Sequence, residues 1–122
     1  YDMILIKENH IRWAGGLERA LDSALEYAQE ANLDIEIEVS NLDEYKRAAK
    51  YSIKMIMLDH FSNDELRTAV EYPHGDILLE ASGNVNLNTV KDIASTGVDV
   101  ISVGALTHSV ECFDFSLLFY EK

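Results

Sequence analysis

The chain has 122 residues, a formal net charge of −12 and 48% hydrophobic content, which is enough for one modest core. The acidic excess argues against a surface for nucleic acid or for an anionic membrane, because both need basic patches. No apolar run approaches the roughly 20 residues that span a bilayer. Cys112 is the single cysteine, so no internal disulfide can form, and we expect a reducing, cytoplasmic location.

Short apolar runs alternate along the chain with longer segments of helical periodicity. We expect strands at residues 3–6, 35–39, 55–58, 77–79 and 100–103. We expect helices at residues 17–31, 42–51, 63–71 and 87–96. Asn41 can cap the second helix, and Ser62 with Glu65 forms a capping box for the third. Repeated βα steps of this kind predict an α/β protein with a parallel sheet and helices outside it.

The second strand favours a barrel over an open, doubly wound sheet. Ile35, Ile37 and Val39 point to one side of the strand, whereas Glu36 and Glu38 point to the other. A parallel strand covered by helices on both faces should be apolar on both. Two acids on one face fit better if that face lines a barrel interior. We therefore expect a piece of an α/β (TIM-like) barrel with about five parallel strands; the doubly wound sheet stays the alternative, although its G-x-G-x-x-G motif is absent.

Acidic residues stand at the ends of three successive strands. The active site of an α/β barrel forms at the carboxyl ends of its strands, so Glu38, Asp59 and Glu80 could converge there. Converging carboxylates repel one another unless protons or a cation intervene, and hard oxygen ligands suit Mg²⁺. The other interpretation is that each acid caps a helix or faces water.

Glycine-containing turns follow the last two strands. Ser82, Gly83 and Asn84 follow the fourth strand, and Gly104 follows the fifth, with His108 four residues further on. In barrels, loops after the late strands often hold a phosphate through backbone N–H groups. The alternative is that both are ordinary tight turns.

Lys7 follows the first strand, at the same expected rim. A lysine beside acids and phosphate loops suits a phosphate or carboxylate partner. Composition alone would instead allow a solvated surface lysine.

Five strings in the chain resemble those of one enzyme family, in its order and near its spacing. They are LIKENHI (residues 5–11), IEIEV (35–39), MLD (57–59), LEASGN (79–84) and ISVGALTHS (101–109). This set is similar to that of the quinolinate phosphoribosyltransferases, also called nicotinate-nucleotide pyrophosphorylases (carboxylating). The resemblance covers essentially all 122 residues.

The resemblance implies a reaction and a domain. The family transfers a phosphoribosyl group from phosphoribosyl pyrophosphate to quinolinate, releasing pyrophosphate and CO₂ and leaving nicotinate mononucleotide for NAD synthesis; Mg²⁺ is required. Residues 1–122 would then be the C-terminal portion of the barrel domain. We expect an N-terminal domain and the start of the barrel outside this chain, a homodimer or higher homo-oligomer, and no activity from the piece alone.

The resemblance also implies roles for particular residues. It gives catalytic roles to Lys7, Glu38 and Asp59, and the metal to Glu38 and Asp59. It gives substrate or phosphate binding to Lys7, Glu38, Asp59, Ser82, Gly83, Asn84, Gly104 and His108. Two positions depart from the family: Asn84 stands where many relatives have glycine, and His60 where they commonly have asparagine. Two alternatives stay open: a related phosphoribosyltransferase that uses nicotinate or another acid, and a truncated, non-catalytic partner protein.

Overall fold

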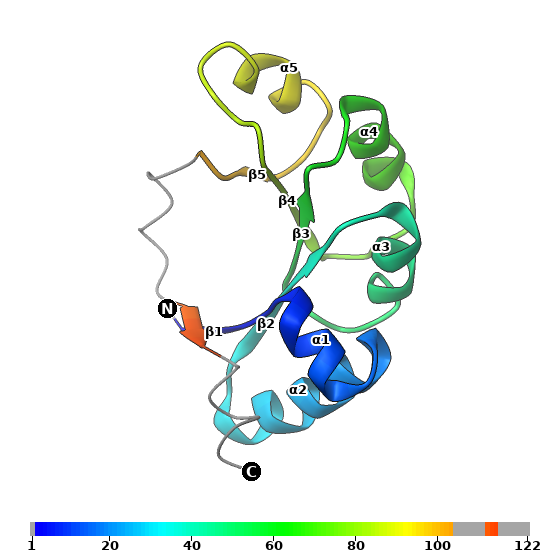
Figure 1. Ribbon diagram of the computed structural model, residues 1–122, viewed down its shortest axis with the longest axis vertical. Coiled ribbons are helices and arrows are strands. Elements are labelled where there is room, and N and C mark those ends of the chain that lie inside the picture. Colours follow the sequence, from blue (N-terminus) through cyan, green and yellow to red (C-terminus); the bar gives the residue numbers. More distant parts are fainter. Residues whose placement is uncertain (1, 104–111, 115–122) are drawn as a thin grey trace.

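The structure is a computed structural model that describes residues 2–103 and 112–114 (Figure 1). Strands and helices alternate along these residues. The strands are β1 (Met3–Ile6), β2 (Asp34–Val39), β3 (Met55–Asp59), β4 (Leu78–Ser82), β5 (Val100–Ile101) and β6 (Cys112–Asp114). The helices are α1 (Glu8–Ala14), α2 (Leu17–Ala31), α3 (Leu42–Ala48), α4 (Asn63–Glu71) and α5 (Val90–Ala94).

All six strands belong to one curved sheet. Their order is β5-β4-β3-β2-β1-β6, and every neighbouring pair is parallel. Helices α2, α3 and α4 lie along the convex side of the arc, and no helix of the described residues lies on the concave side (Figure 1). A doubly wound sheet would carry helices on both faces. The α/β barrel segment expected from the sequence is therefore confirmed.

The two faces of the sheet have opposite character, because side chains alternate along each strand. The convex face is apolar and almost completely buried beneath the helices: Ile4, Ile37, Ile56 and Leu58 are 0% exposed. The concave face carries Glu36 together with the residues two positions before and after it in β2. The expectation from the second strand, apolar on one side and acidic on the other, is confirmed.

The helix starts predicted from the capping residues Asn41 and Ser62 are confirmed. Asn41 accepts a 2.8 Å hydrogen bond from the backbone N–H of Glu44. Ser62 and Glu65 exchange the two hydrogen bonds of a capping box. The helix α2 has the predicted limits, whereas α3 ends at Ala48 and α5 is much shorter than expected. None of the helices described in residues 2–103 is long and apolar enough to cross a membrane.

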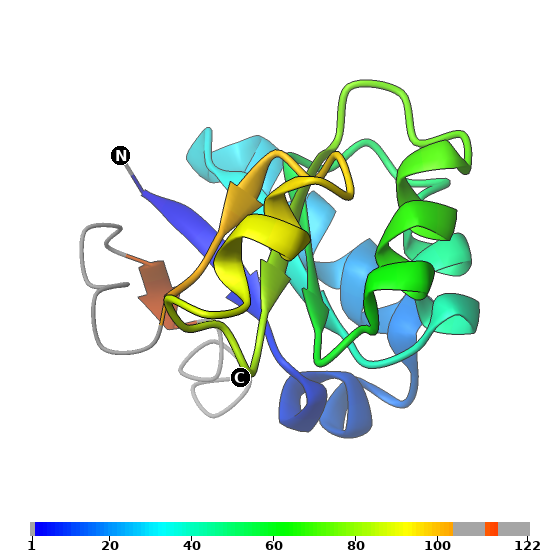
Figure 2. The ribbon, with the colours of Figure 1, turned by 90° about the horizontal axis from the view of Figure 1, so that it is seen from above.

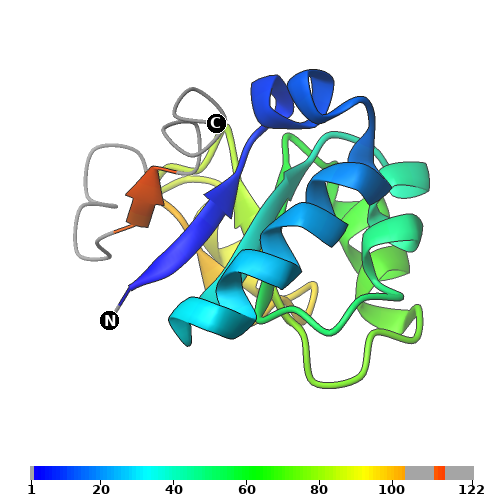
Figure 3. The ribbon, with the colours of Figure 1, turned by 90° about the horizontal axis from the view of Figure 1, so that it is seen from below.

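Two elements were not predicted from the sequence. The first is α1, which begins directly after Lys7; the backbone N–H of Lys7 donates a 2.8 Å hydrogen bond to Nδ1 of His10. This helix lies beyond the carboxyl end of β1, while the longer helices flank the sheet (Figures 2 and 3). The second is β6, which adds to the free side of β1.

Two strands differ from the prediction by more than one residue. The strand β4 runs on to Ser82, so Glu80 lies in the middle of it and not at its end. The strand β5 contains only Val100–Ile101.

Candidate functional site

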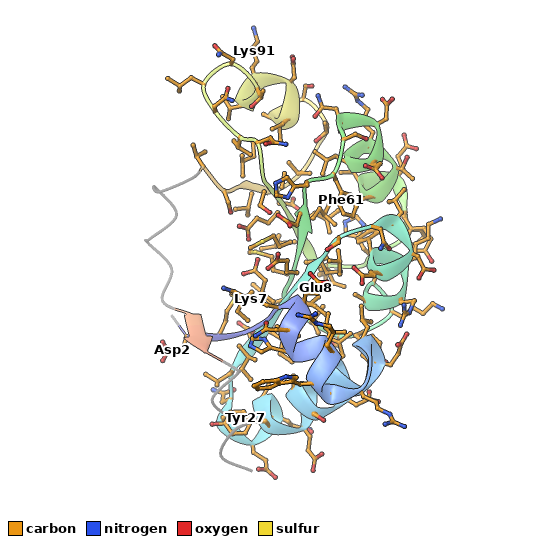
Figure 4. All side chains as sticks on the ribbon, viewed as in Figure 1. Asp2, Lys7, Glu8, Tyr27, Phe61 and Lys91 are labelled. Atoms are coloured by element: carbon orange, nitrogen blue, oxygen red, sulfur yellow. The ribbon has the colours of Figure 1, made fainter. Side chains whose placement is uncertain are left out.

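Polar side chains gather where neighbouring strands end. Lys7 follows β1, Glu38 lies next to the last residue of β2, and Asp59 and Ser82 end β3 and β4. Asp59 and Ser82 are register partners, so their side chains share the concave face. Lys7 also points toward the concave side, whereas Glu8 begins α1 beside it (Figure 4). The structure thus brings four of the predicted residues to one rim.

Glu38 and Asp59 form a close pair of carboxyl groups. Burial raises the pKa of Glu38, and the charge of Asp59 and a hydrogen bond between the two groups raise it further. The ammonium group of Lys7 acts in the opposite direction and lowers that pKa. Because the negative charge of Asp59 disfavours the ionised form of Glu38, a cation bound between the two carboxyl groups would relieve their repulsion.

Asp59 also connects this pair to the turn after β4. The hydroxyl of Ser82 donates a 3.1 Å hydrogen bond to Oδ1 of Asp59. Nδ1 of His60 lies 3.0 Å from the same oxygen. The Asp59 side chain is only 28% exposed, so its orientation is fixed from two sides.

The turn after β4 has the backbone of a tight, glycine-dependent loop. Gly83 has φ +86° and Asn84 has φ 54°, both in the left-handed region. A Cβ on Gly83 would lie 2.8 Å from the ring of His60, so the position excludes a side chain for two reasons. Asn84 adopts the left-handed conformation that asparagine tolerates better than most residues. Asn84 is therefore compatible with the backbone of this turn.

A second acidic pair lies deeper on the concave face. Glu36 is 4% exposed and Glu80 7% exposed. Burial raises the pKa of Glu36 to about 9, helped by the hydrogen bond and the charge of Glu80. Ser102 donates a hydrogen bond to Oε2 of Glu80. Among the described residues, Oε2 of Glu36 has no hydrogen-bond partner.

The deeper pair corrects the expectation that Glu80 converges with Glu38 and Asp59 at the rim. Because β4 is longer than predicted, Glu80 lies two residues before the strand end and contacts Glu36 instead. Sequence reasoning placed Glu36 on the interior face but gave it no partner. The signal that could have found the pair is the alternation itself, since Glu36 and Glu80 both fall on interior positions.

The described part of the rim offers two carboxyl groups to a metal ion and not a complete set of protein ligands. Within residues 2–103, no three His, Cys, Asp or Glu side chains are grouped so that they could hold a metal by themselves. Mg²⁺, however, is often held by one or two carboxylates together with waters and substrate phosphates. The Glu38–Asp59 pair fits that mode of binding. Gly104 and His108, the remaining predicted phosphate-binding residues, lie outside the described residues.

The fold and the rim together define the class of protein. It is an α/β barrel segment whose polar residues lie at the carboxyl ends of the strands, which is the end where barrel enzymes have their active sites. Residues 1–118 match the family model described as quinolinate phosphoribosyl transferase, C-terminal domain. The chain therefore belongs to the quinolinate phosphoribosyltransferase family.

Curated relatives agree along nearly the whole chain. The chloroplastic nicotinate-nucleotide pyrophosphorylase [carboxylating] of Arabidopsis thaliana is 42% identical over 134 residues, which cover 96% of this chain. The enzyme of the same name from Homo sapiens is 33% identical and covers 98% of this chain. The chain spans only 38% of the length of the Arabidopsis protein and 41% of the human one.

Solved structures give the same result. The nicotinate-nucleotide pyrophosphorylase from Francisella tularensis is 44% identical, with a TM-score of 0.79; the match covers 93% of this chain and 40% of that one. Thiamine phosphate pyrophosphorylase from Pyrococcus furiosus is 24% identical with a TM-score of 0.62, and it supports the fold alone.

Proposed function

We propose that the complete protein transfers a phosphoribosyl group from phosphoribosyl pyrophosphate to quinolinate and decarboxylates the product to nicotinate mononucleotide. The observation that carries this proposal is the rim formed by Lys7, Glu38, Asp59 and Ser82 in a chain of this family. Residues 1–122 would be the C-terminal portion of its barrel domain.

The rim suits the chemistry of this transfer. When pyrophosphate leaves C1 of the ribose, positive charge develops on the sugar, as in other glycosyl transfers. The carboxyl groups of Glu38 and Asp59 would face that charge and stabilise it. Lys7, whose ammonium group already acts on Glu38, would bind a carboxylate or phosphate of the substrates. The turn at Ser82, Gly83 and Asn84 would hold a phosphate through its backbone, with Gly104 and His108 completing a second phosphate loop.

We also propose that Mg²⁺ is the cofactor and that Glu38 and Asp59 hold it. The support is that the charge of Asp59 raises the pKa of Glu38, so the two carboxyl groups repel each other when both are ionised. Bound there, Mg²⁺ would neutralise charge on the pyrophosphate leaving group.

The charges of the rim support the proposal that other protein segments contribute to substrate binding. Both proposed substrates carry several negative charges, and removing them from water without paired cations would be prohibitive. Lys7 is the cation that acts on Glu38, and the chain has only ten Lys and Arg in all. We therefore propose that other parts of the polypeptide and a partner subunit of a homodimer or higher homo-oligomer supply the remaining cations.

We also propose a cytoplasmic location, and the support for it is that the chain has a single cysteine.

The test is a pair of assays on the protein made from its complete gene. Phosphoribosyl pyrophosphate and Mg²⁺ are supplied with quinolinate in one assay and with nicotinate in the other, and pyrophosphate is measured. Release that depends on quinolinate supports the proposal. Release with nicotinate alone would assign the sister activity, and no release with either from a folded protein would favour a non-catalytic partner protein.

A further inference from the structure

His60 occupies an unusual place in the rim. It is the residue after β3, and its backbone is left-handed, with φ 58°. A non-glycine residue in this region is uncommon and needs support from its surroundings. The support comes from the neighbouring strand, because the backbone N–H of His60 donates a 2.9 Å hydrogen bond to the carbonyl oxygen of Ser82.

The side chain of His60 makes two further contacts. Nδ1 lies 3.0 Å from Oδ1 of Asp59, within the range in which a ring N–H donates to a carboxylate. The ring also lies flat against Gly83: three ring atoms, Cγ, Cδ2 and Nδ1, are each 2.8 Å from the place where a Cβ on Gly83 would be.

One residue therefore touches both parts of the proposed phosphoribosyl site. Asp59 belongs to the acidic pair, and Ser82 and Gly83 belong to the phosphate turn. Ser82 itself donates to the same Asp59 oxygen, so Asp59, His60 and Ser82 form a closed set of contacts. The side chain of His60 is nevertheless 60% exposed. It is thus not part of the hydrophobic core, and its removal leaves no buried cavity.

We propose that His60 is a positioning residue that holds the Asp59 carboxylate and the Ser82–Gly83 turn at a fixed separation, and thereby sets the affinity of the site for phosphoribosyl pyrophosphate. The proposal rests on the proposed function. It goes beyond it by assigning a role to a residue to which the proposed function gives none. Such a residue should act on substrate binding and leave the rate of the bound complex little changed.

The test uses a matched pair of substitutions in the protein made from its complete gene. His60→Gly removes the ring and adopts the left-handed backbone without strain, so the variant should fold. His60→Asn keeps a short donor for Asp59 and also tolerates that backbone. His74→Ala is the control, because His74 lies in a turn before β4 and its ring contacts only the carbonyl oxygen of Tyr72 among the contacts described for it.

The first readout is direct binding of phosphoribosyl pyrophosphate with Mg²⁺ and no acceptor, measured by calorimetry. His60→Gly should weaken binding about tenfold, the loss expected for one contact to a charged group. His60→Asn should restore most of the affinity, and His74→Ala should bind as the unchanged protein does. In turnover, His60→Gly should raise KM for phosphoribosyl pyrophosphate and leave kcat nearly unchanged.

Three results would overturn the proposal. One is unchanged binding by a folded His60→Gly, even if its melting temperature falls, because the role would then be structural only. Another is binding by His60→Asn that is as weak as binding by His60→Gly. The third is an unchanged protein that does not bind phosphoribosyl pyrophosphate at all. Weaker binding by His60→Gly in a protein that turns over no quinolinate would support the role of His60 and contradict the proposed function, so the two failures are distinguishable.

Discussion

The convex and concave faces of the same sheet serve different purposes. The convex face holds apolar side chains under the helices, and within that helical layer the hydroxyl of Tyr45 donates to the carbonyl oxygen of Ala69 at 2.6 Å. The concave face holds Glu36 and Glu38, whose pKa values are raised by burial and by neighbouring carboxyl groups. Perturbed acids of this kind destabilise a fold and tend to occur at functional sites. The contrast indicates that one face stabilises the domain and the other provides its chemistry.

The largest effect should come from the convex face. Ile37 is fully buried there, so Ile37→Ala should lower the free energy of unfolding by about 2–5 kcal/mol. Ile37→Val, the matched control, should cost about 0.5–1.5 kcal/mol. Denaturant titration measures both. Activity per folded molecule should not change in either variant. A fall in kcat at equal folded fraction would contradict the claim that the convex face contributes only to stability.

The next effect should come from the rim and should appear in activity. Asp59→Asn keeps the shape of the side chain but removes its charge, and we expect kcat/KM to fall by about 10²–10³-fold with little loss of stability. Asp64→Asn is the control, since Asp64 is an exposed residue of α4 paired with Arg67. Steady-state kinetics on both variants measure the difference. Equal activity of the two would remove Asp59 from the site.

The deeper pair should make stability depend on pH. The pKa of Glu36 is about 9 in the folded protein against 4.5 for an unperturbed glutamate. The stability associated with protonated Glu36 is therefore complete below pH 4.5 and is lost progressively as pH rises toward 9, at up to about 1.4 kcal/mol per pH unit. Glu36→Gln, which stays neutral, should remove this slope. Denaturant titrations of both proteins between pH 5 and 9 test it, and parallel curves would contradict the assignment.

The smallest effect should come from a partly exposed ion pair on the helical side. Arg47 hydrogen-bonds Glu18 at 2.6 and 2.7 Å, and this contact lowers the pKa of Glu18 to about 2. Any stability from Glu18 is present above pH 4.5 and is lost as pH falls through 2, the opposite direction to Glu36. Because both side chains are partly exposed, at 39% for Arg47 and 46% for Glu18, Glu18→Gln should change the melting temperature only slightly, and less at high salt.

Sequence patterns predicted most of the sheet and its rim. The strands β1 to β5 and the helix α2 follow from hydrophobic periodicity, and the helices beginning after Asn41 and Ser62 follow from capping chemistry, because these are local properties. The placement of Lys7, Glu38, Asp59 and Ser82 at one rim followed from parallel strand order. All of this information lies in residues close together in the sequence.

The remainder depends on contacts across the sheet. The pairing of Glu36 with Glu80 needed the register of three strands, and a strand end three residues later than the apolar run suggested. The contact of His60 with Gly83 joins two loops, so no local pattern signals it. The helix α1 lacks a clear apolar period, and its first turn is fixed by the backbone of Lys7 donating to His10.

The measurement that tests the central claim most directly is release of CO₂ from quinolinate labelled at its 2-carboxyl group, by the complete protein with phosphoribosyl pyrophosphate and Mg²⁺. The account predicts labelled CO₂ and pyrophosphate in equal amounts, with both nearly abolished in Asp59→Asn and both retained in Asp64→Asn. Undiminished release from folded Asp59→Asn, or no release from the unchanged protein, would contradict the claim that the concave rim carries this chemistry.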